Sequence, residues 1–370
     1  MRGASVNHKH QNLNTIAESA KSIVKSVDSP PKHRVLFICK RLNIHYTGGY
    51  AAYGLLNSAK FIANALRAIG VESKAVIVED ANGIDREIHQ YNPTHVIIHA
   101  LWVTPIKLAE LLTLHPQQRW VIRLHSKAPF IANEGIAFEW LRGYLNLMPS
   151  FPNIAISCNN EEFNCELDAV MPGMHPIYLP NIYCPDPITF GPPPPDNSDF
   201  NIACFGALRP MKNQLEQALA AFMFADRIGK RLRFHINVDR VEQRGETVLK
   251  NMRFLFKDSK HMLVEHPWYS HEEFLSSLRV VDIGMQVSFT ESFNIVTADC
   301  IKMNVPVVVS DEIDYIPFLF RANPTSVENI IFHLYLAYWF GKVGSWLNLQ
   351  GLRRTNNNAL AVWEDYLKVC

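Results

Sequence analysis

Several features that mark other classes of protein are missing from this sequence of 370 residues. Its longest apolar run, residues 330–340, contains His333 and is too short to cross a bilayer, which takes about 20 residues. Residues 1–20 are polar and lack the apolar stretch of a secretory signal. We therefore expect a cytoplasmic protein with no transmembrane segment.

The cysteine patterns of metal-binding and disulfide-rich proteins are missing as well. The seven cysteines include no C-x-x-C pair, and several lie in apolar, strand-like runs. Buried thiols in a reducing compartment explain these positions better than disulfides or a zinc site. An H-E-x-x-H motif is also absent. We expect no bound metal ion.

No charge of one sign dominates the chain. It has 36 lysines and arginines against 35 acidic residues, which gives a formal net charge of +1. A chain of this kind lacks the global basic field that announces binding to nucleic acid or to an acidic membrane. A local basic patch remains possible.

Two common nucleotide-binding motifs are absent. The sequence contains neither G-x-G-x-x-G nor G-x-x-x-x-G-K-[ST]. It therefore lacks the fingerprints of dinucleotide-dependent hydride transfer and of P-loop phosphoryl transfer. Any nucleotide must be bound by another arrangement.

What the sequence does contain is a regular alternation of strand and helix patterns from residue 34 onward. Short runs rich in β-branched residues alternate with helical patterns, which is typical of parallel sheets covered by helices. In the first half, the predicted strands are 34–39, 75–78, 95–99, 120–124 and 153–157. In the second half, the predicted strands lie within 201–208, 232–238, 262–265, 282–287 and 305–309. The pattern predicts two α/β domains, each with a doubly wound parallel sheet.

A proline-rich segment separates the two halves. Its prolines remove hydrogen-bond donors and fix φ, so it cannot continue a helix or a central strand. An amphipathic pattern near the end predicts a final helix. The predicted parts are an N-terminal extension, a first Rossmann-like domain, a linker, a second Rossmann-like domain and a C-terminal helix, at residues 1–33, 34–184, 185–199, 200–350 and 351–370.

Residues 286–310 are the most informative stretch, because they predict a strand, a turn, a helix and a second buried strand. The helix is expected to begin on Ser292-Phe293-Asn294. Unpaired N–H groups and a partial positive charge at a helix N-terminus favour an anion. Glu291 precedes this helix start, and Asp299 lies eight residues further on, about 12 Å along the axis. A nucleotide-sugar fits this arrangement, and an ordinary helix with two solvated acids is the alternative.

Two basic residues follow the first strand of the second half. Arg209 and Lys212 stand three residues apart at the entry of the next helix. Cations are disfavoured at a helix N-terminus unless an anion is close by. Together with the helix N-terminus they would form a clamp for a diphosphate. The alternative is a pair of surface cations.

The first half offers two further candidates. His125 ends the strand WVIRLH, where a side chain at the carboxyl end of a parallel strand faces the cleft. Gly48-Gly49 in the loop after the first strand would let the backbone approach a ligand closely. His45 and Tyr50 border this pair and are candidate acceptor contacts. A hydrogen-bonded loop histidine and a common glycine turn are the alternatives.

These motifs together resemble those of retaining glycosyltransferases with the GT-B fold, of the family 4 kind. The E-x7-E element of that family corresponds to Glu291 through Asp299, and its R-x-x-K pair to Arg209 and Lys212. This sequence departs from the pattern in three places, because Ser292 and Asn294 replace glycines and Asp299 replaces a glutamate. The resemblance implies two Rossmann-like domains facing across a cleft, and a final helix that packs back toward the first domain.

The resemblance also implies functions for these parts. The first domain would lie on the acceptor side, and the second would bind a nucleoside diphosphate sugar, with a UDP-sugar as the expected co-substrate. Transfer would need no metal, in agreement with the absence of a D-x-D motif. The residues implied in catalysis are His125, Arg209, Lys212 and Glu291. Those implied in donor binding are Gly48, Gly49, Ser292, Phe293, Asn294, Ile295 and Asp299.

The acceptor is left open by the sequence. A hydroxyl on a glycan or a lipid-linked intermediate is the usual acceptor for the family, and a hydroxylated base in DNA is an alternative. A DNA acceptor would need a basic surface along the cleft, to which Arg231, Arg233, Arg240 and Arg244 would contribute. From another class, the departures from the motif suggest a nucleotide-sugar-binding protein without catalysis. The oligomeric state is not legible from the sequence.

Overall fold

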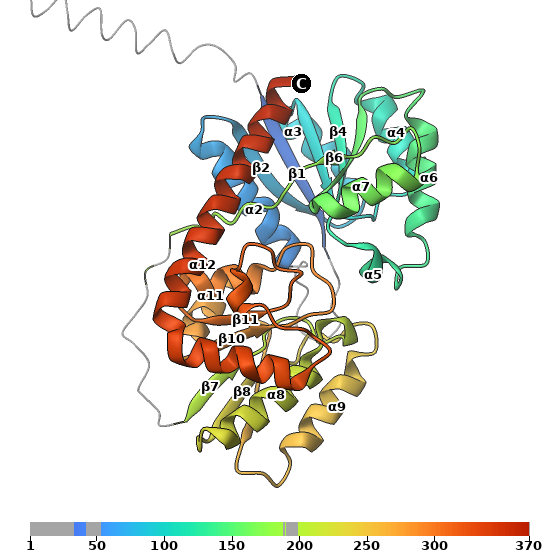
Figure 1. The fold of residues 1–370 in the computed structure, drawn as a ribbon. Coiled ribbons are helices and arrows are strands. Elements are labelled where there is room, and N and C mark those ends of the chain that lie inside the picture. The colour runs from blue at the N-terminus through green and yellow to red at the C-terminus, as the bar shows by residue number, and fades with distance from the viewer. Residues whose placement is uncertain (1–32, 42–52, 188, 190–198, 370) are drawn as a thin grey trace, which may run out of the picture.

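The computed structural model describes residues 33–41, 53–187, 189 and 199–369. They form two α/β domains, one above the other in Figure 1, with the final helix running along both. Each domain is a parallel sheet with helices against it. The predicted fold class is therefore confirmed.

The first domain contains a six-stranded sheet in the order β2-β1-β3-β4-β5-β6, and its paired strands are all parallel. The strands are β1 (Arg34–Lys40), β2 (Glu72–Val78), β3 (His95–His99), β4 (Arg119–Leu124), β5 (Ile154–Cys158) and β6 (Ile177–Tyr178). The helices are α2 (Tyr53–Ala68), α3 (Gly83–Tyr91), α4 (Pro105–Leu114), α5 (Ala128–Ile131), α6 (Ala137–Leu147) and α7 (Glu161–Val170). Central strands such as β1 and β3 are buried on both faces, which explains their almost continuous apolar sequences. The sequence pattern missed β6 because it has two residues.

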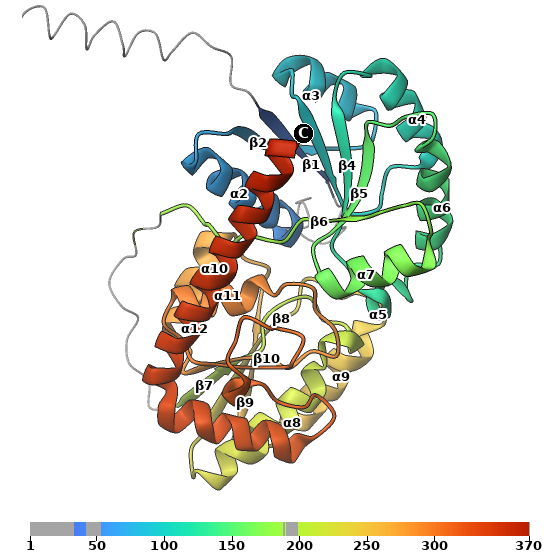
Figure 2. The same ribbon diagram turned by 45° about the horizontal axis from the view of Figure 1, so that its top comes forward.

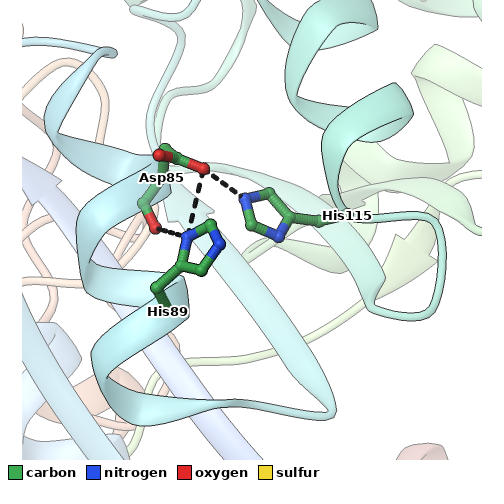
Figure 3. Close-up of side chains that lie close together, drawn as sticks. All are labelled: Asp85, His89 and His115. Carbon is green, nitrogen blue, oxygen red and sulfur yellow. Dashed lines mark hydrogen bonds and ion pairs between the residues drawn. The ribbon is translucent and has the colours of Figure 1, made fainter.

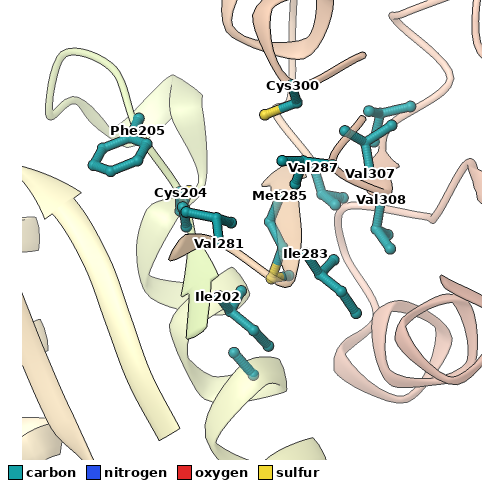
Figure 4. Close-up of a cluster of buried hydrophobic side chains, with 14 of the residues drawn as sticks. Ile202, Cys204, Phe205, Val281, Ile283, Met285, Val287, Cys300, Val307 and Val308 are labelled. Carbon is teal, nitrogen blue, oxygen red and sulfur yellow. The ribbon is translucent and has the colours of Figure 1, made fainter. Parts of the chain in front are cut away.

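The second domain contains a five-stranded sheet in the order β11-β10-β7-β8-β9, and its paired strands are also parallel. The strands are β7 (Phe200–Ala203), β8 (Leu232–Asn237), β9 (Met262–His266), β10 (Ile283–Gln286) and β11 (Val307–Val309). The helices are α8 (Gln214–Arg227), α9 (Gly245–Phe256), α10 (His271–Ser277), α11 (Ile295–Lys302) and α12 (Val327–Val369), with 3₁₀ turns η1 (Pro210–Lys212), η2 (Leu278–Val280) and η3 (Phe318–Phe320). Figure 4 shows buried side chains from β7, β10 and β11 packed together, among them Ile202, Met285 and Val307.

The strand order places a topological switch point at the centre of the second sheet. The chain leaves β7 toward β8 and β9 on one side and returns to β10 on the other. Open parallel sheets bind ligands beyond the carboxyl ends of the strands at such a point. The loops that follow β7 and β10 carry Arg209 and Lys212 on one side and Glu291 to Asn294 on the other. The fold therefore brings the two sequence motifs together.

The last helix differs from the sequence prediction. We expected a separate helix near the C-terminus, whereas α12 runs without interruption from Val327 to Val369. It lies first along the second domain and then changes direction and runs up beside the first domain (Figures 1 and 2). Near its end, the Trp363 indole N–H donates to the carbonyl oxygen of Pro180 at 2.9 Å, and its ring meets Phe37 edge-on.

Glycines explain why the length of α12 was missed. Gly341 and Gly344 weaken a helical pattern because glycine is a poor helix former. In the structure they allow close packing, since a Cβ on Gly344 would lie 2.5 Å from the Phe320 ring and one on Gly341 would lie 2.6 Å from Pro306. Tertiary contact therefore overrides the local preference. Among the described helices, α12 included, none combines the length and the apolar character needed to span a bilayer.

Candidate functional site

A cavity of about 550 Å³ lies between the two domains. The first domain contributes Lys127 and Asn159 to its wall, and the second contributes Arg240 and Glu242. Eight of the residues predicted from the sequence also line it, namely His125, Arg209, Lys212, Glu291, Ser292, Phe293, Asn294 and Ile295. Asp299 lines a smaller adjoining cavity. The remaining predicted residues, His45, Gly48, Gly49 and Tyr50, lie outside the described residues.

The loop after β7 is fixed by Asn213, whose backbone is left-handed with φ of 58°. The buried amide of Asn213 donates to the carbonyl oxygens of Val287 at 3.2 Å and Pro324 at 2.7 Å. The N–H of Phe289 in turn donates to the carbonyl oxygen of Met211 at 3.0 Å. The loops after β7 and β10 are thus tied to each other, and this connection positions Lys212, which precedes Asn213.

Lys212 and Glu291 form an ion pair across these two loops. Their side chains are 13% and 9% exposed, so water screens the pair little. Burial lowers the pKa of Lys212, and the carboxylate of Glu291 opposes that shift. The charges of Lys212 and Glu291 are therefore paired with each other in this structure, whereas the sequence pattern predicted that each side chain would contact a ligand. A ligand anion near Lys212 must share it with Glu291.

Arg209 is positioned by contacts from both domains. Its guanidinium lies 3.3 Å from Glu242 and sits over the ring of Phe130, which belongs to α5 of the first domain, at 4.6 Å from the ring centroid. Its Nε is buried and has no hydrogen-bond partner among the residues that the structure describes. Glu242 is shared with Arg240, at 2.6 Å. An acceptor atom of a ligand would satisfy the free N–H of Arg209.

Among the described residues of the cavity wall, basic side chains outnumber acidic ones by one. The charged residues that line it are Lys127, Arg209, Lys212 and Arg240 on the positive side and Glu134, Glu242 and Glu291 on the negative side. Burial raises the pKa of Glu134, which makes this carboxylate easier to neutralise. The balance suits an anionic ligand that makes several contacts.

The N-terminus of α11 opens into the same cavity. The helix begins at Ile295, slightly later than predicted, with Asn294 as its N-cap. The Asn294 side chain accepts from the N–H of Thr297 at 2.8 Å and donates to Gln286 at 2.8 Å and Glu291 at 3.2 Å. Asn294 thus replaces the family glycine with a capping side chain. The cap uses the N–H of Thr297, so the N–H groups of Ile295 and Val296, which have no partner within a helix, are the ones left for a ligand.

Ser292 joins the two domains at the edge of this cavity. Its hydroxyl donates to the carbonyl oxygen of His125 at 2.7 Å and accepts from the amide of Asn159 at 3.0 Å. A second connection runs from Lys127 in the first domain to Glu312 in the second, at 3.1 Å. A glycine at position 292, as in the family pattern, would lack both contacts of the hydroxyl.

His125 is held in one tautomer by a buried network. Its Nε2 lies 3.0 Å from an N–H of Arg123 and 2.8 Å from Nδ1 of His99. Arginine can only donate, so Nε2 of His125 must accept, and its proton is therefore on Nδ1. Burial and the charge of Arg123 hold the pKa of His125 well below its usual value. His125 is thus neutral, with Nδ1–H as its remaining donor.

Arg123 itself is fully buried beneath the cavity. It donates to the carbonyl oxygen of Leu179 at 2.9 and 3.0 Å and to the side-chain oxygen of Asn181 at 2.7 Å. Burial lowers its pKa to about 9. This anchor was not predicted, because the sequence pattern treated residue 123 as part of an apolar strand.

Asp299 is almost completely buried, and its surroundings differ from those predicted. One carboxylate oxygen accepts from the hydroxyl of Tyr183 at 2.6 Å and lies 2.7 Å from Nε2 of His271. Burial raises the pKa of Asp299, and His271 and Tyr183 oppose the shift. Asp299 therefore already has two protein partners where the resemblance implied a contact with the donor.

The adjoining cavity has a volume of about 190 Å³ and shares Arg209 and Lys212 with the larger one. Aromatic side chains form part of its wall, namely Trp268, Tyr269 and Phe274. Flat apolar walls with a few polar groups suit a planar ring. Sequence reasoning missed these residues, although the segment PWYSH directly follows a predicted strand and thus lies at the carboxyl end of the sheet.

Solved structures resemble the chain in fold at low sequence identity. An E. coli trehalose-6-phosphate protein bound with UDP-2-fluoro glucose matches with a TM-score of 0.63 and 12% identity, over 90% of this chain and 99% of that chain. A UDP-forming trehalose-phosphate synthase from Burkholderia xenovorans matches with a TM-score of 0.58 and 12% identity, over 91% and 98%. The S. aureus protein TarM, in a complex with UDP, gives a TM-score of 0.54 and 10% identity, over 74% of this chain and 55% of that chain.

No protein-family model and no curated protein sequence matches the chain. The likeness is therefore one of architecture, and it extends over 90% of this chain. The chain has the GT-B fold, and the described part of its predicted site gathers at two adjoining cavities.

Proposed function

We propose that this protein is a glycosyltransferase that moves a sugar from a nucleoside diphosphate sugar to an acceptor hydroxyl, with retention of configuration. The observation that carries the proposal is the meeting of Arg209, Lys212 and the N-terminus of α11 at one cavity. All three favour a dianionic group at the same place. The switch point of the second sheet is where an α/β fold of this type binds such a ligand.

The proposed donor is a UDP-sugar. Its diphosphate would lie against Arg209 and the first turn of α11, and its base would enter the smaller aromatic cavity beside Trp268 and Phe274. Two of the structural relatives contain UDP or a UDP-sugar analogue. This placement leaves the sugar in the larger cavity, near His125.

The chemistry follows from where negative charge develops. When the sugar leaves, the nucleoside diphosphate gains charge, which Arg209 and Lys212 would stabilise without a metal ion. Lys212 is held by Glu291 before the donor binds, so its cation is already in place. The neutral Nδ1–H of His125 is a donor for a hydroxyl of the sugar. The acceptor hydroxyl would attack on the face from which the diphosphate departs, so that the bond from the sugar to the acceptor oxygen forms as the bond to the phosphate oxygen breaks, and the hydroxyl proton passes to the departing diphosphate.

The test is sugar transfer, or slow donor hydrolysis without acceptor, by a Lys212→Ala variant. Loss of one group that stabilises developing charge should reduce the rate by about 10²- to 10³-fold. Lys250→Ala is the matched control, because Lys250 is exposed on α9 and lines neither cavity. Equal rates in the two variants would reject the proposal.

A nucleotide-sugar-binding protein without catalysis is the second candidate. It is favoured by the hydroxyl of Ser292, which fills space near His125 that a family glycine would leave open. Such a protein would bind UDP-sugars and release no free sugar during long incubation. Mass spectrometry of the donor after incubation separates the two candidates.

A DNA acceptor has less support. Of the four arginines singled out in the sequence, Arg240 lines the cavity, and it is paired with Glu242. Arg231 and Arg233 both lie 4.0 Å from the carboxylate of Asp199. A glycan or a lipid-linked hydroxyl is therefore the acceptor class that we propose.

A further inference from the structure

Three potential metal ligands meet on the surface of the first domain. Asp85 and His89 are one turn apart on α3, and His115 directly follows α4. Figure 3 shows both imidazole rings directed toward the Asp85 carboxylate. Nε2 of His115 lies 2.8 Å and Nδ1 of His89 lies 3.3 Å from the same oxygen of Asp85. The three residues line neither of the cavities described above.

The separations between donor atoms suit a small tetrahedral cation. Bonds of about 2.0–2.1 Å at tetrahedral angles place neighbouring donor atoms about 3.3 Å apart. The donor atoms of Asp85, His89 and His115 all lie within 4.8 Å of one another. Only small side-chain adjustments would therefore bring the three onto one ion. Two imidazoles and a carboxylate form a ligand set typical of zinc.

The burial of the three residues leaves one side of the cluster open. His115 is 7% exposed, whereas Asp85 is 43% and His89 is 70% exposed. The backbone of His115 is fixed on both sides, because its N–H donates to Leu111 at 2.9 Å and its carbonyl oxygen accepts from the Trp120 indole at 3.3 Å. His115 is therefore a rigid, buried ligand, whereas Asp85 and His89 are exposed ligands one helical turn apart. This arrangement allows an ion to enter from solvent and to keep one bound water molecule.

We propose that Asp85, His89 and His115 form a binding site for a zinc-class divalent cation. The ion would join α3 to the residue that follows α4, and its role would be structural. Without an ion, the cluster is held by hydrogen bonds from the imidazoles, including one between Nδ1 of His89 and the carbonyl oxygen of Asp85 at 3.0 Å. Zinc would replace these hydrogen bonds by coordinate bonds to neutral imidazoles.

The experiment is calorimetric titration of zinc into chelator-treated full-length protein. His8 and His10 are replaced by alanine in every sample, so that their segment contributes no zinc ligands. One zinc ion should bind per chain. Loss of a residue that only supports a metal ligand typically weakens metal binding by roughly 10- to 100-fold. Because His89 is proposed as a direct ligand, His89→Ala should weaken zinc binding by more than that. Because His89 is exposed, this variant should fold normally.

The matched control is His175→Ala. His175 is 81% exposed and lies 3.3 Å from the carboxylate of Asp168, so it is a surface histidine–aspartate pair outside the described three-ligand cluster. Its loss should leave zinc affinity unchanged. A second readout is the visible absorption of bound Co²⁺, which should be intense for a tetrahedral site and should vanish in Asp85→Asn.

The proposal fails if the unmodified cluster binds no zinc. It also fails if His89→Ala and His175→Ala bind zinc equally well.

Discussion

The ammonium group of Lys212 is paired with the carboxylate of Glu291, and this pair links the loops that follow β7 and β10. Both side chains are nearly buried in the wall of the interdomain cavity. In our account the carboxylate holds the cation in position and competes with a ligand diphosphate for it. This competition can be measured.

Glu291→Gln should bind UDP several-fold more tightly than the native protein, because Lys212 then has no competing carboxylate. Sugar transfer should nevertheless fall, since Glu291 is proposed to hold the Lys212 cation in position for the departing diphosphate. Calorimetry with UDP and a transfer assay measure the two effects separately. Glu242→Gln offers a comparison, because it removes the carboxylate beside Arg209 instead. Weaker UDP binding by Glu291→Gln would contradict the competition.

The lowered pKa of Lys212 predicts proton uptake when UDP binds. Above that pKa the free protein carries neutral Lys212, and an anionic ligand favours the protonated form, so UDP affinity should decrease over the pH range in which Lys212 loses its proton. Lys212→Arg should lose this dependence, because a guanidinium stays charged over this range. Calorimetric titrations of UDP in buffers with different ionisation enthalpies give the number of protons that the protein takes up on binding. No uptake in the native protein would rule out this role for Lys212.

Ser292→Gly should loosen the contact between the domains. It removes the hydrogen bonds from Ser292 to His125 and from Asn159 to Ser292, each worth about 1 kcal/mol. We expect faster amide exchange around residues 125–127 and 159–160 and a decrease of about 1–2 kcal/mol in the free energy of unfolding. Asn159→Ala, which removes one of the two bonds, should have a smaller effect. Unchanged exchange in both variants would show that these bonds do not hold the domains together.

Buried histidines predict that the protein loses stability in acid. Burial lowers the pKa of His95 to about 4 and of His235 to about 3, and it holds the pKa values of His99 and His125 well below the usual range. Unfolded histidines bind protons below about pH 6.5. Because the unfolded state then binds more protons, the free energy of unfolding should fall as the pH decreases below this value, by up to about 1.4 kcal/mol per pH unit for each histidine.

Urea unfolding at pH 7.5, 6.0 and 5.0 measures this dependence. His95→Gln should reduce the pH dependence of the free energy of unfolding, because glutamine does not titrate. Equal free energies of unfolding at the three pH values would mean that these histidines bind protons as readily in the folded protein as in the unfolded state.

Much of the fold was accessible from the sequence because parallel strands buried on both faces have a distinct apolar pattern. The carboxyl ends of such strands share one edge, so Arg209, Lys212 and His125 could be expected near a common cleft. The pairing of Lys212 with Glu291 could not be predicted. It depends on how Asn213 ties one loop to Val287 and Pro324, which no local pattern records.

The surroundings of Asp299 were hidden for a similar reason. Its partners Tyr183 and His271 come from the end of the first domain and from α10, far away in the chain. The length of α12 was also missed, because Gly341 and Gly344, which are poor helix formers, are held in the helix by close packing against Pro306 and Phe320. Contacts between segments that are far apart in the chain therefore determine both the surroundings of Asp299 and the length of α12.

The most direct test of the diphosphate site is a titration of inorganic pyrophosphate, which carries the proposed anion without base or sugar. The native protein should bind it, and Arg209→Ala should bind it at least 10-fold more weakly, because a buried guanidinium donor is lost. Lys250→Ala should bind it like the native protein. Equal binding by all three proteins would contradict the central claim that Arg209, Lys212 and α11 hold a diphosphate.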